Sequence, residues 1–319
     1  LYFSEDYPGA LAQYIVVRDS QLSDEHREEA AFSAILSQME IVKSAVARGE
    51  LSPKPSLIDE ARLASNNDEQ PSGEAQGEGS KGPKTITPEP LPKLAQEALA
   101  LRQVYLDAEL SNEEDPERVP VMLYKVGEIY LDYRDLPKAR ERFERLINEF
   151  PRSSVAEAAA TALIETFRLE EDWPKMAEWA ERIAQAGLGE AVVSQAKLWK
   201  VGALYKTAQR LFDQKKYAEA AQEYLSLVDQ NPDNEFAAAA LNNGAVAFER
   251  ARMFDSAMKT YERIYREFAN SEFSENALFR VAFNAERFYN YDKAVVTFSE
   301  LAQRYPKGEH AADAAFNAA

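Results

Sequence analysis

The feature that most constrains this chain is a helical hairpin that recurs along its C-terminal two thirds. In residues 275–306, apolar side chains at helical spacing are interrupted at Asn290 and Tyr291, resume at Ala294, and end before Pro306. The residue that opens the second stripe recurs at intervals of 37, 44, 37 and 37 residues, as Ala139, Met176, Ala220, Ala257 and Ala294. Two-helix units that repeat at about this length stack into solenoids. The sequence therefore predicts an all-α protein built as a solenoid of helix-turn-helix repeats.

Composition narrows the classes of partner. The net charge is -17, and residues 1–119 contribute 23 acids against 11 bases, so the acidic excess is concentrated before the repeats. Nucleic acids and anionic membranes select a basic surface, which argues against general binding to either. The chain has no cysteine, which excludes disulfides and thiolate metal sites and is compatible with the cytosol or a bacterial periplasm. No run of 18 or more apolar residues is present, so no transmembrane segment is expected.

The chain divides by composition into five stretches. Residues 1–4 look like the remnant of a cleavable tag, and the native termini are expected to lie outside this sequence. The stretches that follow are an N-terminal helical segment (5–64), an acidic flexible linker (65–92), a helix leading into the array (93–119), and an array of about five repeats plus the start of a sixth (120–319). The linker is rich in Asn, Glu, Gly, Ser and Pro, which favours a disordered middle.

Two helices are predicted within the N-terminal segment. A shorter one is expected around residues 10–17. The stronger one has Ser23 as a possible N-cap and ends at Gly49. Its apolar stripe comprises Phe32, Ile35, Leu36, Met39, Val42 and Val46.

The hairpins resemble tetratricopeptide repeats. In that family a large residue, a Leu-Gly or Leu-Ala pair and an aromatic line the first helix, while a small residue, an aromatic, an aliphatic and a proline mark the second. The first repeat here has Leu123, Val126, Gly127, Tyr130, Ala139, Phe143, Leu146 and Pro151, and the fifth has Leu278, Val281, Ala282, Tyr291, Ala294, Phe298, Leu301 and Pro306. The resemblance implies a right-handed superhelix in which the small residue lets two helices approach closely.

The second repeat departs from this pattern. At the positions where the second helices of the other repeats carry a large residue, the small residue that opens the stripe, and an aromatic, it has Trp173, Met176 and Ala180. It ends at Gly187 and Gly189 without a proline. The additional seven residues before repeat three predict a long first helix, from about Glu190 to Phe212. Two interpretations stay open: a tolerated irregularity, or a local bend or partner site around Trp173, Trp179 and Trp199.

The resemblance also predicts where a partner binds. In tetratricopeptide repeats the first helices line a concave groove. The groove positions carried over to this sequence are Tyr124, Glu128, Arg168, Tyr205, Gln209, Asn242, Arg250, Phe283 and Arg287. Tyr, Phe and Arg are enriched in binding hot spots. The Lys and Asn clamp that holds a C-terminal carboxylate in chaperone-binding members is missing, so we expect an extended or helical segment held by aromatic contacts, with arginines pairing its acids.

No catalytic constellation accompanies these repeats. The two histidines, His26 and His310, are far apart in sequence, and no metal, cofactor or phosphate-loop motif is present. We therefore expect a non-enzymatic protein with no cofactor and no metal.

The style of the repeats is similar to bacterial cell-envelope members of the family. These are outer-membrane assembly lipoproteins, Tol-Pal-associated coordinators and myxobacterial gliding-motility proteins. The similarity implies a scaffold in a motility, outer-membrane or secretion assembly, in the periplasm or at the outer membrane. A cytosolic regulatory scaffold that captures a peptide, and a non-catalytic segment of a larger envelope enzyme or secretion machine, are the alternatives.

Overall fold

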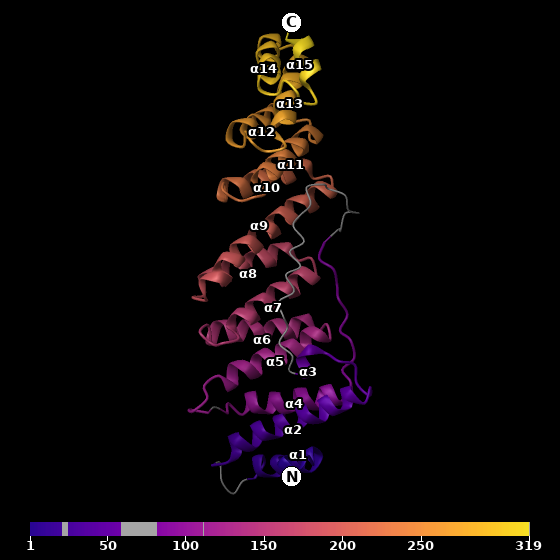
Figure 1. Cartoon of the computed structure of the whole chain (residues 1–319), viewed down its shortest axis with the longest axis vertical. Helices are drawn as coiled ribbons and strands as arrows, with labels where there is room; N and C mark the ends of the chain where they lie inside the picture. Colours follow the sequence, from indigo (N-terminus) through magenta and orange to yellow (C-terminus); the bar gives the residue numbers. More distant parts are fainter. Residues whose placement is uncertain (21–24, 59–81, 111, 319) are drawn as a thin grey trace. The chain divides into compact units, whose positions relative to one another are not determined.

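The computed structural model describes residues 1–20, 25–58, 82–110 and 112–318, and these contain helices and no strands (Figure 1). Before the repeats lie α1 (Tyr7–Arg18), α2 (Arg27–Ala47), α3 (Pro55–Ile58) and α4 (Lys93–Asp107), after a short 3-10 turn at Tyr2–Ser4. The repeats comprise α5 (Arg118–Asp132), α6 (Leu136–Glu149), α7 (Ala156–Leu169), α8 (Trp173–Gln185), α9 (Glu190–Asp213), α10 (Tyr217–Gln230), α11 (Ala237–Arg250), α12 (Phe254–Glu267), α13 (Ser274–Arg287), α14 (Tyr291–Arg304) and α15 (Ala311–Asn317). The prediction of an all-α repeat solenoid is confirmed.

Contacts divide the described residues into two compact units. The first contains 1–20, 25–58, 84–110, 112–172 and 178–197, and the second contains 82–83, 173–177 and 198–318. The first unit therefore joins the N-terminal helices to the first repeats, and the second holds the later hairpins.

The N-terminal helices begin and end at recognisable signals. The carboxylate of Asp6 accepts a hydrogen bond from the backbone N–H of Gly9 at 3.0 Å and caps α1, which is longer than predicted. Helix α2 begins at Arg27, and its predicted cap, Ser23, lies outside the described residues. Gly49 follows α2 with a φ of 73°, the left-handed conformation that glycine adopts at helix ends.

Helix α2 is long and apolar, and it is also packed against other helices. By length and composition alone it could cross a membrane, with a mean hydropathy of 1.2 over its best window. However, 44% of that window is buried, and the helix packs against α1 and α4. Ala34, Ile35 and Ala45 have no exposed surface. The same apolar residues are thus used as an internal packing face.

The turn inside every hairpin has one conformation. The second residue after each first helix has a positive φ between 54° and 62°, at Arg134, Glu171, Lys215, Arg252 and Tyr289. The intervals between these residues, 37, 44, 37 and 37, equal those between Ala139, Met176, Ala220, Ala257 and Ala294 in the sequence. None is glycine, so each turn carries a large side chain in a conformation that costs an L-residue about 1–2 kcal/mol. We call the three residues between the two helices of a repeat its turn edge.

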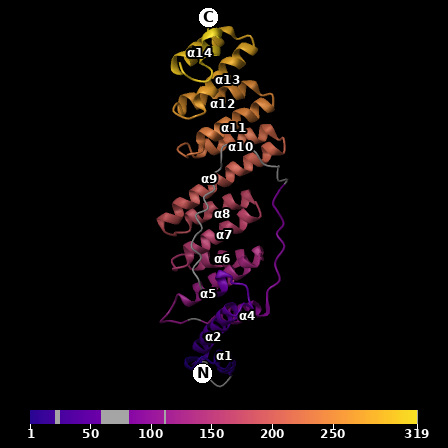
Figure 2. The same ribbon diagram turned by 45° about the vertical axis from the view of Figure 1, so that its right-hand side comes forward.

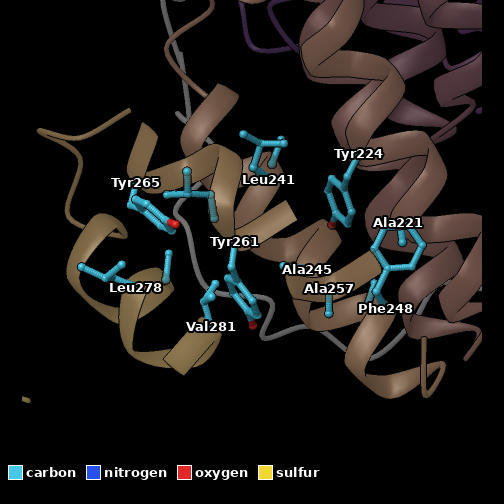
Figure 3. Close-up of a cluster of buried hydrophobic side chains, with 14 of the residues drawn as sticks. Ala221, Tyr224, Leu241, Ala245, Phe248, Ala257, Tyr261, Tyr265, Leu278 and Val281 are labelled. Atoms are coloured by element: carbon cyan, nitrogen blue, oxygen red, sulfur yellow. The ribbon is translucent and has the colours of Figure 1, made fainter. Parts of the chain in front are cut away.

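The predicted packing residues form the core. Ala257, Tyr261 and Ile264 on α12 have no exposed surface, and the corresponding residues of α6, α10 and α14 are at most 3% exposed. In the second unit these side chains pack against α11 and α13, where Leu241, Leu278 and Val281 are also fully buried (Figure 3). The small residue and the aromatic therefore occupy the roles that the repeat pattern implies.

The long first helix of repeat three is confirmed. Helix α9 spans 24 residues, against 14 for α11 and α13. Of the tryptophans proposed for a partner site, Trp179 is 6% exposed, whereas Trp173 and Trp199 are half-buried. Trp179 therefore serves packing.

The end of the predicted linker is an extended segment that lies against the first unit. Residues 84–92, which we call the strap, lead into α4 (Figure 2). The backbone N–H of Glu89 donates to the carbonyl oxygen of Tyr133 at 2.7 Å, and that of Lys84 donates to the carbonyl oxygen of Glu170 at 2.6 Å. The flexible linker was predicted over residues 65–92. Residues 65–81 of it lie outside the described residues, whereas residues 84–92 are held by these backbone hydrogen bonds.

Candidate partner-binding surface

The first helices of the repeats carry the predicted groove residues in both units. In the first unit, Tyr124 on α5 is half-buried, and its ring lies 5.9 Å from that of Phe143. Glu128, one turn along α5, is 1% exposed, and its Oε2 lies 3.2 Å from Nζ of Lys125. Glu128 is thus enclosed as one half of an internal ion pair, and it presents no surface to a partner in this structure.

Helix α7 contributes an accessible cation to the first unit. Nε of Arg168 donates to Oε2 of Glu165 at 2.6 Å, and the Arg168 side chain is 47% exposed. A pair this exposed contributes little to stability.

In the second unit, α9 presents one predicted residue and encloses another. Tyr205 is 3% exposed, its ring packs edge-on against Tyr224 at 5.3 Å, and its hydroxyl accepts a hydrogen bond from Nδ2 of Asn243 at 2.6 Å. Burial raises the pKa of the Tyr205 hydroxyl, opposed by the hydrogen bond from Asn243. Gln209, four residues on, is half-buried and accepts from Nζ of Lys206 at 3.3 Å. Tyr205 is therefore a core residue that joins α9 to α10 and α11.

Helix α11 supplies a polar group and a cation. Asn242 is half-buried, and its Oδ1 is buried without a hydrogen-bond donor among the described residues. An acceptor in this state is costly unless a donor from water or a ligand reaches it. Arg250, two turns further along the helix, is exposed.

Helix α13 supplies the aromatic part of the surface. Phe283 is 41% exposed and stacks on Phe279 with ring centres 6.0 Å apart. Phe279 in turn stacks on His310 at 4.0 Å. Arg287, one turn after Phe283, is exposed, and its guanidinium lies 5.7 Å from the ring of Phe254. An apolar contact and a cation thus lie on one face of α13.

Polar side chains connect α11 with α13. Glu249 accepts a hydrogen bond from Nδ2 of Asn284 at 3.1 Å and lies 3.8 Å from Arg280. Tyr261 lies nearby, and burial followed by the charge of Glu249 raises the pKa of its hydroxyl. Glu249 therefore links α11 to α13 through Asn284 and Arg280.

The structure therefore sorts the nine predicted residues by accessibility. Arg168, Arg250, Phe283 and Arg287 are exposed, Tyr124, Gln209 and Asn242 are half-buried, and Glu128 and Tyr205 are buried. The repeat position alone did not distinguish these cases, because the size of the neighbouring side chains decides whether a position opens to solvent.

One exposed apolar cluster was missed by the sequence reasoning. It lies at the α13–α14 turn and the start of α14 and comprises Phe288, Tyr289, Tyr291, Val295 and Val296, each at least 43% exposed. The signal was present, since three aromatics within residues 288–291 are unusual for a turn.

The described helices define an α-helical repeat protein. A family model described as tetratricopeptide repeat matches residues 122–153, 202–234 and 276–308, so the chain carries tetratricopeptide repeats. The matched stretches are the first, third and fifth hairpins. The second and fourth have the same positive-φ turn at Glu171 and Arg252.

Solved structures of repeat proteins are similar to the chain at low sequence identity. The TPR2AB domain–pHSP90 complex of yeast Sti1 is 11% identical over 70% of this chain and 91% of that chain, with a TM-score of 0.30. Yeast Tom70 is 15% identical over 98% and 77%, with a TM-score of 0.30, and the apo form of RapI is 10% identical over 98% and 79%, with a TM-score of 0.35. A search of curated proteins found no match.

Proposed function

We propose that this chain is a non-catalytic scaffold that holds a segment of a partner protein on the first helices of its repeats. The observation that supports the proposal is the exposed pair on α13, with Phe283 stacked on Phe279 and Arg287 one turn away. An exposed, pre-stacked aromatic beside a cation is a suitable anchor, because little side-chain entropy remains to be lost on binding.

The exposed arginines indicate which partner segment would bind to the first helices. Arg250 and Arg287 lie on first helices of the second unit, and each is exposed; Arg168 is an exposed cation on a first helix of the first unit. The proposed partner segment is the one that fits the second unit. Guanidinium groups pair with carboxylates in bidentate geometry. We infer an extended or helical partner segment that combines an apolar side chain with acidic residues.

We further propose an envelope context, with the protein in the periplasm or at the outer membrane as part of a motility, outer-membrane or secretion assembly. Support comes from the likeness of the repeat sequences to bacterial envelope members. A cytosolic peptide-capturing scaffold and a segment of a larger envelope machine are the competing assignments. Fractionation of source cells, together with the full reading frame, tests all three: a cytosolic location of the full-length protein would rule out the envelope assignment.

Photo-crosslinking tests the binding surface directly. A benzophenone amino acid at position 283 on α13 is compared with one at Lys259, an exposed position on the second helix α12. We expect a discrete crosslinked partner from position 283 that is lost with Arg287→Glu, and none from position 259. Equal crosslinking from both positions would contradict a first-helix binding surface.

A further inference from the structure

The strap shows how an extended segment can bind to the turn edges of this array. Its two backbone N–H donors, Lys84 and Glu89, contact the first turn-edge residue of repeats two and one, Glu170 and Tyr133. Each acceptor is the residue that follows a first helix. Ion pairs accompany the backbone contacts: Lys84 pairs with Glu171, and Nζ of Lys54 lies 3.6 Å from Glu89.

The spacing of these contacts follows from geometry. The first helices α5 and α7 of successive repeats contact each other as well as α6 between them, so the strap itself gives the spacing of the two turn edges. Five residues of extended or polyproline chain span about 16 Å at 3.1–3.3 Å per residue. Lys84 and Glu89 are five residues apart. An extended segment that runs antiparallel to the array therefore meets one turn edge every five residues.

The side chains of the strap follow the same period. Ile86 and Leu91 are its half-buried apolar residues and are also five apart. Leu91 packs on the cluster that contains Tyr133. Pro88, Pro90 and Pro92 keep the neighbouring backbone extended. We call the five residues that begin at Lys84 or at Glu89 a pentad. Each pentad begins with a backbone N–H donor, and an apolar side chain follows two residues later.

The corresponding edge in the second unit is aromatic and uncovered. Phe288 occupies in repeat five the position that Tyr133 occupies in repeat one, yet Phe288 is 46% exposed whereas Tyr133 is 4% exposed. Tyr289, on the same turn, and Tyr291, the first residue of α14, are 80% and 57% exposed. The ring of Phe288 lies 5.0 Å from that of Phe254 in repeat four, so the apolar surface continues across two repeats.

The acceptors at this edge are also available. The carbonyl oxygens of Ala251 and Phe288 are equivalent to those of Tyr133 and Glu170, and neither accepts a backbone hydrogen bond among the residues that the structure describes. Arg252 is exposed beside Ala251. In the strap's register, the residue that corresponds to Glu89 would lie opposite this cation.

We propose that the turn edges of repeats four and five bind an extended, proline-containing segment of a partner protein in the register of the strap. The segment donates a backbone N–H to Phe288 and, five residues later, to Ala251. Its prolines and apolar side chains lie on Phe288, Tyr289 and Tyr291, as aromatic grooves bind polyproline helices. Its second pentad begins with an acidic residue that pairs with Arg252. This surface adjoins the first-helix surface proposed above, since Arg287 and Phe288 both lie against Phe254, but it uses the turn edges in place of the first helices.

The test uses the full chain and a labelled peptide of residues 82–92, whose two pentads supply the required pattern. Fluorescence anisotropy is measured with the unaltered chain and with Tyr289→Ser/Tyr291→Ser. We expect binding of the peptide and an affinity loss of about tenfold or more in the variant, because two aromatic contacts are removed. Phe316→Ser, at an 82% exposed aromatic on α15, is the matched control and should bind as the unaltered chain does. Circular dichroism establishes that each variant retains its helices.

A charge exchange tests the register. The peptide with Glu89→Lys should bind the unaltered chain more weakly and recover its affinity on an Arg252→Glu chain. Phe283→Ser should leave peptide binding unchanged, which separates this surface from the first-helix site.

Three outcomes would overturn the proposal. The first is absence of peptide binding at millimolar concentration. The second is equal affinity of the folded Tyr289→Ser/Tyr291→Ser variant. The third is concentration-dependent dimerisation that this variant abolishes, because the occupant would then be a second copy of the chain.

Discussion

Arg118 anchors the N-terminal helices to the first repeat, and its replacement by Met should be costly. Its Nη1 donates to both carboxylate oxygens of Glu28 at 3.1 and 3.0 Å and to Glu29 at 2.9 Å. The guanidinium also lies 4.2 Å from the centre of the Phe32 ring. The side chains of Arg118 and Glu28 are only 15% and 16% exposed. Removing the cation therefore leaves a largely enclosed carboxylate with fewer partners.

The expected loss can be bounded from these contacts. Breaking a buried ion pair by removing one partner costs about 3–5 kcal/mol. Glu28 keeps its hydrogen bonds from Tyr105 and from Asn112, so the lower end applies. Loss of the contact with Phe32 adds about 0.5–1 kcal/mol. We expect Arg118→Met to lower the free energy of unfolding of the first unit by about 3.5–4 kcal/mol.

The pH dependence gives an independent check. Burial raises the pKa of Glu28, but hydrogen bonds from Tyr105, Asn112 and Arg118 outweigh it and hold the pKa below its ordinary value of 4.5. A depressed carboxylate pKa stabilises the fold fully above the unfolded pKa and loses its effect as pH falls through the folded pKa. The difference between Arg118→Met and the unaltered chain should therefore be largest near neutral pH and narrow below about pH 4.5.

Urea unfolding monitored by circular dichroism, together with hydrogen exchange on α2, measures the loss of unfolding free energy and its dependence on pH. Arg145→Met is the matched control, because Nε of Arg145 meets Glu149 at 3.0 Å while the two side chains are 38% and 50% exposed. This exposed pair should cost at most about 0.5 kcal/mol. Equal losses for the two variants, or a gap that does not narrow in acid, would refute the assigned role of Arg118.

Three further predictions concern packing. Gly127→Ala should destabilise the chain by about 1–3 kcal/mol in thermal unfolding, because the added Cβ would lie 2.5 Å from the ring of Phe143. Gly202→Ala, where nothing lies within 4 Å, should instead stabilise α9 by about 0.5–1 kcal/mol, and a loss there would contradict the reasoning. Leu91→Ser should loosen the strap and speed amide exchange at Glu89 by about tenfold, whereas the exposed Thr85→Ser should not, and an unchanged rate in Leu91→Ser would show that Leu91 does not hold the strap.

Much of the helical architecture could be predicted from the sequence because it is encoded locally. The markers Ala220, Ala257 and Ala294 predicted buried helix contacts, and each is at most 3% exposed. The extra residues before repeat three predicted the long helix α9, which the structure contains. Helical periodicity is a property of neighbouring residues, so one sequence suffices to detect it.

The candidate surface was less predictable. Tyr205 and Phe283 both came from the predicted groove positions, yet Tyr205 is 3% and Phe283 is 41% exposed. The hydrogen bond from Asn243 and the ring of Tyr224 enclose Tyr205, and both come from helices that follow α9 in the chain. Such enclosure depends on contacts between helices, which the repeat position does not specify.

The sequence by itself determined the repeat, its length and the residues that pack inside each hairpin, because these follow from the period of apolar side chains. Only the tertiary structure decided where the strap lies and which turn edges remain uncovered. The strap has no helical period, and its position depends on carbonyl oxygens of Tyr133 and Glu170, which come from separate repeats. The exposure of Phe288 is likewise a property of the tertiary structure, because the strap covers Tyr133 at the equivalent turn position whereas Phe288 is exposed.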